Sequence, residues 1–270
     1  MTPTTAHRVI VRAARVGHLA TGFVYLIVGG VALAAAIDTG RPAVDAQGAL
    51  QMVLTGPVGD ALLIAVAAGL TADFVWQIVR AVTNADLAPA SAVGIANRIG
   101  WVMSGFVHLG LAVTAVKLAF DLPQRTAEHQ AKASAAAVMT LPIGWLALMT
   151  AGVVIVLVAV HLVYRAIVGD VDRWLDVTRL GPTLSALILW LGRFGLAMRA
   201  VVFCAGGILL ARAALQHRPW ATRGLGGILI ALESIPYGGA LLALVGAGFV
   251  AFGVVELASA RYRIIAGDVK

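Results

Sequence analysis

The sequence predicts an all-α integral membrane protein with six transmembrane helices, arranged as three parallel two-helix repeats about a pseudo-threefold axis. Its composition is 60% hydrophobic and 12% charged, whereas soluble domains are about 45–50% apolar and about 25% charged. Each of six apolar segments is long enough to cross about 30 Å of hydrocarbon as a helix. These segments are residues 16–37, 58–79, 99–120, 141–164, 194–215 and 235–258. Helices are expected because lipid satisfies no backbone polar group and the alternating strands of a barrel are missing.

Two short motifs alternate at the starts of these segments. The first, third and fifth segments open with Arg15-Val-Gly17, Arg98-Ile-Gly100 and Arg193-Phe-Gly195, and the other three open with Pro-x-Gly at 57–59, 142–144 and 236–238. A unit of two helices returns the chain to the side from which it entered, so the three copies are predicted to be parallel rather than inverted. We expect the repeats to comprise residues 1–96, 97–180 and 181–270.

Small residues follow the three motif arginines at a fixed spacing. They stand seven and fourteen positions after each arginine, at Gly22, Gly105, Ala200, Gly29, Ala112 and Gly207. At 100° per residue these offsets return to within about 40° of the arginine's direction. The spacing predicts a smooth stripe on each of these helices, which is suited to close packing against a neighbouring helix.

Basic residues favour one orientation in the membrane. The formal net charge is +7, but the Lys and Arg residues are scattered at the ends of the apolar segments, which argues against nucleic acid as a partner. With both termini in the cytoplasm, twelve of them lie on the cytoplasmic side and seven on the other. We expect the loops 38–56, 121–140 and 216–234 outside, as short interfacial helices. Residues 5–14 and 182–192 are expected along the inner surface or as extensions of the spans.

Five ionisable residues fall inside the predicted spans, where each is costly by about 2.5–3.5 kcal/mol on insertion scales for Asp and Arg and is a default functional candidate. They are Asp73, His108, His161, Arg199 and Glu256. In a structural interpretation Arg199 pairs with Asp73 or Glu256 and fixes the helix arrangement, while His108 forms a hydrogen bond across an interface. In a functional interpretation the carboxylates line a half-channel or substrate pocket that opens to the cytoplasm, where they exchange protons or bind a cation.

Catalytic and cofactor motifs are not found in the sequence. It has no GxSxG turn and no HExxH or other zinc-protease spacing, so we expect no enzyme activity, no metal and no cofactor. Haem is the alternative, because His18, His108 and His161 include possible axial ligands. The three histidines lie at different depths along their helices, which argues against it.

The repeated motifs also carry a family resemblance. The Arg-x-Gly openings, the glycine spacing and the Pro-x-Gly starts resemble the bacterial membrane proteins classed as domain of unknown function 1206, in which a pair of transmembrane helices occurs three times. The resemblance covers nearly the whole chain. It implies a plasma-membrane protein and carries over no catalytic residue.

The sequence therefore predicts a non-catalytic, multi-pass plasma-membrane protein with a structural or interaction role. A small channel or transporter for protons, ions or small solutes, using the ionisable residues of the cytoplasmic half, is the alternative. The lipid bilayer is the expected partner. The sequence defines neither a protein partner nor an oligomeric state.

Overall fold

The computed structural model describes residues 5–37, 46–54, 56–83, 92–123, 125–169, 175–176 and 179–263. Six of its helices are long and apolar enough to cross a membrane, which confirms the predicted fold class. They are α1 (Thr5–Ile37), α3 (Gly56–Thr83), α4 (Ala92–Ala119), α6 (Gly144–Val168), α7 (Pro182–Leu215) and α9 (Gly238–Tyr262). We call α1, α4 and α7, which begin the repeats, the leading helices, and α3, α6 and α9 the trailing helices.

Short helices occupy the three loops in which they were predicted. These are α2 (Ala46–Val53), α5 (Ala127–Met139) and α8 (Leu225–Glu233), with a 3-10 turn, η3 (Pro219–Ala221), before α8. The stretches at 5–14 and 182–192 extend α1 and α7 instead of forming separate surface helices. Gly169, with a φ of 79°, ends α6, and Pro182 begins α7 directly after Gly181, whose φ is 71°. Glycine tolerates these positive φ values, and proline suits the first turn of a helix.

The most extensive packing joins the trailing helix of one repeat to the leading helix of the next. It brings α3 against α4, α6 against α7, and α9 back against α1. Three equivalent contacts that close on themselves are what a cyclic threefold arrangement requires. Within the repeats α1 packs on α3 and α7 packs on α9, whereas α4 and α6 make little contact.

Glycine pairs lie at the centre of two of these contacts between repeats. A Cβ atom built on Gly29 of α1 would lie 2.7 Å from the carbonyl oxygen of Gly246 in α9. A Cβ atom built on Gly207 of α7 would lie 2.7 Å from the carbonyl oxygen of Gly152 in α6. Gly152 and Gly246 each stand eight residues after the glycine of their Pro-x-Gly motif, so the two contacts use equivalent positions.

The other predicted stripe positions also lie at helix contacts. A Cβ atom on Gly22 would lie 2.9 Å from a carbonyl oxygen of α9, and one on Gly105 would lie 3.2 Å from a side chain of α3. Ala112 and Ala200 are buried. The stripe therefore faces the preceding repeat in the ring, as the small side chains allow.

The glycine of the Arg-x-Gly motif packs within its own repeat. A Cβ atom on Gly17 would lie 2.7 Å from the Cα atom of Asp73 in α3, and one on Gly195 would lie 3.0 Å from the Cα atom of Phe252 in α9. Asp73 and Phe252 both stand fourteen residues after their Pro-x-Gly glycine. Gly100, the equivalent glycine of the second repeat, has nothing within 4 Å. The second repeat is therefore open between its leading and trailing helices.

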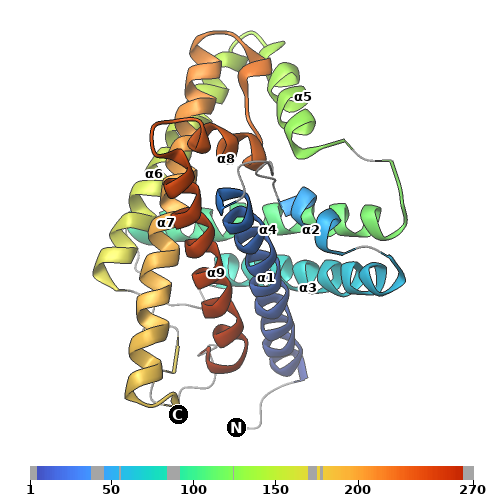
Figure 1. The fold of residues 1–270 in the computed structure, drawn as a ribbon, viewed down its shortest axis with the longest axis vertical. Coiled ribbons are helices and arrows are strands. Elements are labelled where there is room, and N and C mark those ends of the chain that lie inside the picture. Colours follow the sequence, from blue (N-terminus) through green and yellow to red (C-terminus); the bar gives the residue numbers. More distant parts are fainter. Residues whose placement is uncertain are drawn as a thin grey trace.

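Figure 1 shows that the spans are not all parallel. The helices α1, α9, α6 and α7 run roughly along the long axis of the molecule, whereas α3 and α4 run across it. The threefold relation thus holds for the contacts between helices but not for the tilt of α3 and α4. α1 begins and α9 ends at the same end of the molecule, as six spans require.

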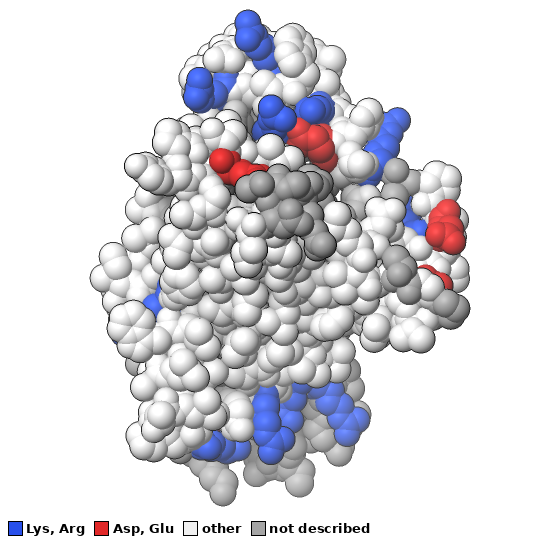
Figure 2. Space-filling view, in the orientation of Figure 1, with Lys and Arg blue, Asp and Glu red and all other residues white. Residues whose placement is uncertain are grey.

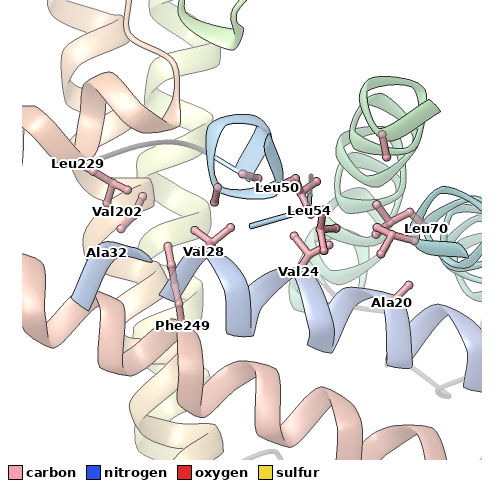
Figure 3. Packing of buried hydrophobic residues seen from close by; sticks show 14 of the residues in the cluster. Ala20, Val24, Val28, Ala32, Leu50, Leu54, Leu70, Val202, Leu229 and Phe249 are labelled. Atoms are coloured by element: carbon pink, nitrogen blue, oxygen red, sulfur yellow. The ribbon is translucent and has the colours of Figure 1, made fainter. Parts of the chain in front are cut away.

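Hydrophobic side chains around α1 form the main core. Figure 3 shows Val24, Val28 and Ala32 along α1, with Leu70 of α3 and Phe249 of α9 packed nearby. Side chains of α2, α7 and α8 complete this cluster. Figure 2 shows charged side chains at the top and bottom of the view and at its right edge, with a largely uncharged surface between these groups. An uncharged surface of this extent fits contact with hydrocarbon.

The motif glycines provide a matched test of the packing. Gly195→Ala should destabilise the protein by about 1–3 kcal/mol, because the added methyl group has no room beside α9. Gly100→Ala should be neutral or stabilising by up to about 1 kcal/mol, because alanine favours helix and the site is open. Unfolding of the purified variants in detergent measures both. Equal effects of the two substitutions would contradict the packing described here.

Candidate functional site: two histidine–carboxylate pairs and an axial cavity

Asp73 and His108 form a buried pair between α3 and α4. Nδ1 of His108 lies 2.5 Å from Oδ2 of Asp73, and Asp73 is 1% exposed. The Gln77 side chain donates a hydrogen bond to the same carboxylate oxygen over 3.3 Å and accepts one from Arg80 over 2.9 Å. The guanidinium of Arg80 also lies 4.5 Å from the ring centre of Trp101. A polar chain thus runs along α3 from His108 towards the end of the helix.

A second pair joins α1 to α9. Nδ1 of His18 lies 2.6 Å from Oε2 of Glu256, and His18 is buried. From the sequence, His18 is expected only as a possible haem ligand, and its pairing with Glu256 is not predicted. A usable signal was present, since His18 and Glu256 both lie within five residues of an arginine at the same end of their helices.

The predicted pairing of Arg199 with Asp73 or Glu256 is wrong. Both carboxylates are taken by histidines, and Arg199 makes no hydrogen bond or ion pair with any residue that the structure describes. Its guanidinium instead lies over aromatic rings, 4.4 Å from the ring centre of Phe252 and 5.3 Å from that of Tyr25. Equal depth in the membrane was a poor guide, because the direction in which each side chain leaves its helix decides its partner.

His161 lies apart from both pairs. Its Nε2 lies 2.8 Å from Oδ1 of Asn97, where α6 meets the start of α4. Among the described residues no group of three His, Cys, Asp or Glu side chains could hold a metal ion. The Nδ1 atoms of His18 and His108 are engaged by carboxylates, which leaves Nε2 as the ring atom that each could offer a ligand. Nε2 of His18 is buried without a hydrogen-bond partner.

The two pairs occupy positions that recur at each contact between repeats. In the first pair of positions, the residue on the leading helix lies three residues after the motif arginine, and the residue on the trailing helix lies eighteen residues after the Pro-x-Gly glycine. In the second pair, the residue on the leading helix lies ten residues after the arginine, and the residue on the trailing helix lies fourteen residues after the glycine. At the first the residues are His18 and Glu256, Trp101 and Gln77, and Leu196 and Leu162. At the second they are Tyr25 and Phe252, His108 and Asp73, and Phe203 and Val158. Histidine–carboxylate pairs therefore stand at positions where another repeat holds Leu196 with Leu162, or Tyr25 with Phe252.

A cavity of about 210 Å³ lies between the leading helices. All of its lining residues come from positions that are equivalent in two or three repeats. The sets are Val24, Val107 and Val202; Tyr25, His108 and Phe203; Thr21 and Arg199; Val28 and Leu111; Leu70 and Phe249; and Ala46 and Leu225. We call it the axial cavity, because equivalent positions of all three leading helices line it.

The second repeat leaves its share of the cavity wall incomplete. α6 and α5 contribute no lining residue, whereas α3 and α9 contribute Leu70 and Phe249, and α2 and α8 contribute Ala46 and Leu225. Val107 lines the cavity from α4 and is 61% exposed. The cavity therefore reaches the surface beside α4, where the second repeat is open.

The helices and the triple repeat define a multi-pass α-helical membrane protein. A family model described as Domain of Unknown Function (DUF1206) matches three times, at residues 16–84, 99–169 and 194–263. The chain belongs to this family, as its motifs suggested. The repeat boundaries at 96/97 and 180/181 stay a prediction.

One curated relative supports this assignment. The chain is 28% identical over 255 residues to "Uncharacterized protein YxxB" of Bacillus subtilis (strain 168), which covers 94% of this chain and 91% of the relative. No solved structure matches the chain.

The equivalent positions allow a test of the His18–Glu256 pair. His18→Leu alone should destabilise the protein, because it leaves without its partner a carboxylate that is only 16% exposed. The loss from breaking a fully buried pair, about 3–5 kcal/mol, is the upper bound. The double change His18→Leu, Glu256→Leu installs the residues that the contact between α6 and α7 already holds, and should restore most of the loss. Detergent unfolding of the two variants decides the matter. A double variant no more stable than the single one would show that the pair is not the reason for the loss.

Proposed function

We propose that this protein is a non-catalytic membrane protein that takes a small solute into the axial cavity, and that it acts as a small transporter. The supporting observation is the lining of the cavity by equivalent positions of the repeats. In transporters built from repeats, substrate sites lie near the bilayer midplane at the interface of those repeats. Ligand pockets are typically apolar with a few polar groups, which describes this cavity.

The groups around the cavity favour binding over chemistry. Of the hydroxyl groups that line it, those of Thr21 and Tyr25, neither is hydrogen-bonded to His108, so no nucleophile is paired with this possible base. Nucleophilic catalysis normally needs such a pairing. The proposal requires no cofactor.

The two histidine–carboxylate pairs favour a structural role for their own residues. Asp73 and Glu256 do not line the axial cavity; Asp73 is buried and Glu256 is partly buried, each at a helix contact. A purely structural or interaction protein is therefore the second candidate. In that case the pairs specify which helices meet, and the axial cavity is incidental.

We also propose that the protein lies in the plasma membrane with both termini in the cytoplasm. The excess of basic residues on that side supports this orientation. Arg15, Arg179 and Arg261 gather around one hollow of about 220 Å³ at the end where α1 begins and α9 ends. A cysteine placed at Met52 of α2 should react with a membrane-impermeant thiol reagent added to intact cells, and labelling only from the cytoplasmic side would reverse the topology.

Filling the cavity separates the two candidate functions. Val202→Phe adds bulk to the cavity wall, whereas Ile208→Phe adds the same kind of bulk to the same helix at a site that is 46% exposed. A deletion strain is compared across a panel of organic acids, amines and alcohols as nutrients or stresses. We expect Ile208→Phe to complement the deletion fully. We expect the complementing activity of Val202→Phe to be at least tenfold lower, when the two variants are present in the membrane at equal amounts of folded protein.

The complementation result decides between the two candidate functions. If Val202→Phe is folded and complements as well as Ile208→Phe, the cavity is not the functional site and the structural role is the better account. The double Leu variant of His18 and Glu256 serves as a second control, since it leaves the cavity lining unchanged and should complement.

A further inference from the structure

We infer that the axial cavity binds a small amphipathic monoanion, such as a short-chain carboxylate, through the guanidinium of Arg199. The inference rests on the solute-binding role proposed above and specifies the chemical class of the solute. It follows from three properties of the cavity: an uncompensated cation, hydrocarbon walls and small size.

Arg199 has no counter-charge among the described residues. Its Nε atom is buried and has no hydrogen-bond partner there, and its guanidinium lies over the rings of Tyr25, Phe203 and Phe252. Aromatic faces attract a cation but accept none of its hydrogen bonds in the plane of the guanidinium. Arg199 is partly buried, and a guanidinium within a membrane normally has a carboxylate or backbone partner. Glu256 of α9, which packs on α7, is held by His18, and Asp73 of α3 is held by His108.

The register of the repeats places this charge at the cavity. The positions equivalent to Arg199 hold Thr21 and Ser104, so one repeat of three carries a cation there. Thr21 lines the cavity beside Arg199, and its buried hydroxyl also has no hydrogen-bond partner. An anionic group at this level would accept hydrogen bonds from both side chains. The guanidinium matches a carboxylate in particular, since its donors fit the two oxygens together.

The rest of the wall fits a short hydrocarbon chain. Val24, Val107 and Val202 form a ring of one residue type around the cavity, and Val28 and Leu111 continue it towards α2 and α8. A volume of about 210 Å³ holds roughly seven water-sized groups at about 30 Å³ each. That is the size of a carboxylate with a chain of a few carbons. Such a solute can enter from the bilayer beside Val107, which is exposed there.

The test compares three probes of one chain length on the full protein in lipid nanodiscs. Pentanoate, 1-pentanol and pentylammonium are titrated by calorimetry at neutral pH, with empty nanodiscs as the blank. We expect pentanoate to bind at least tenfold more tightly than 1-pentanol, with no measurable binding of pentylammonium. Because this comparison uses the unmodified protein, it does not depend on the folding of any variant.

Variants then identify the residue responsible. Arg199→Thr installs the residue of the first repeat and should reduce the affinity for pentanoate at least tenfold while leaving that for 1-pentanol unchanged. Arg199→Lys should restore part of the lost affinity. Val202→Phe should weaken both probes, and Ile208→Phe neither.

The outcomes distinguish this inference from the proposed function. Binding of 1-pentanol or pentylammonium as tight as that of pentanoate would overturn the anion site while leaving a solute-binding cavity. Binding of none of the three probes would count against both. Pentanoate binding that is unaffected by Arg199→Thr would overturn the assignment to Arg199.

Discussion

The structure depends on the close approach of helix backbones that small residues permit. Lipid tails are as apolar as leucine side chains, so burial of hydrocarbon cannot by itself drive helices together in a bilayer. Packing must then come from contacts that lipid cannot make as well. Glycine supplies them here, at Gly29 against Gly246 and at Gly207 against Gly152. Alanines, Ala112 and Ala67, stand at the equivalent positions of α4 and α3. Because small residues recur at a fixed spacing in each repeat, one kind of contact is made several times and the chain closes into a ring.

Polar residues add specificity to the helix contacts that the small residues permit. The His18–Glu256 and Asp73–His108 pairs occupy positions where another repeat holds Leu196 with Leu162, or Tyr25 with Phe252. A buried ion pair adds little net stability compared with apolar residues of similar size, but a helix that brings only one member of the pair is strongly disfavoured. Placing different pairs at equivalent contacts therefore makes each contact specific. Three similar repeats need this distinction, since otherwise any leading helix could dock on any trailing helix.

Much of this arrangement could be predicted from the sequence. The six spans, the repeat and the small-residue stripe follow from composition and spacing, which depend on the chain alone. The neighbours of each helix could not be derived, because a repeat shows which positions are equivalent and not which of them touch. For the same reason Arg199 was assigned to the carboxylates: depth along a helix can be counted from the sequence, but the direction of a side chain around it depends on the neighbours. The opening of the second repeat could not be predicted from the sequence either, since Gly100 stands in the same Arg-x-Gly motif as Gly17 and Gly195.

Each leading helix packs on the trailing helix of the preceding repeat, and α9 closes the ring onto α1. Cysteine cross-linking tests this order of helices directly in a Cys204→Ala background, using a short bifunctional thiol reagent on membranes and protease cleavage between the helices. We expect His18→Cys with Glu256→Cys to join the N-terminal and C-terminal fragments efficiently. We expect no link between His18→Cys and Leu162→Cys, although Leu162 occupies the position in α6 that Glu256 occupies in α9. A link to position 162, or none to position 256, would contradict the ring.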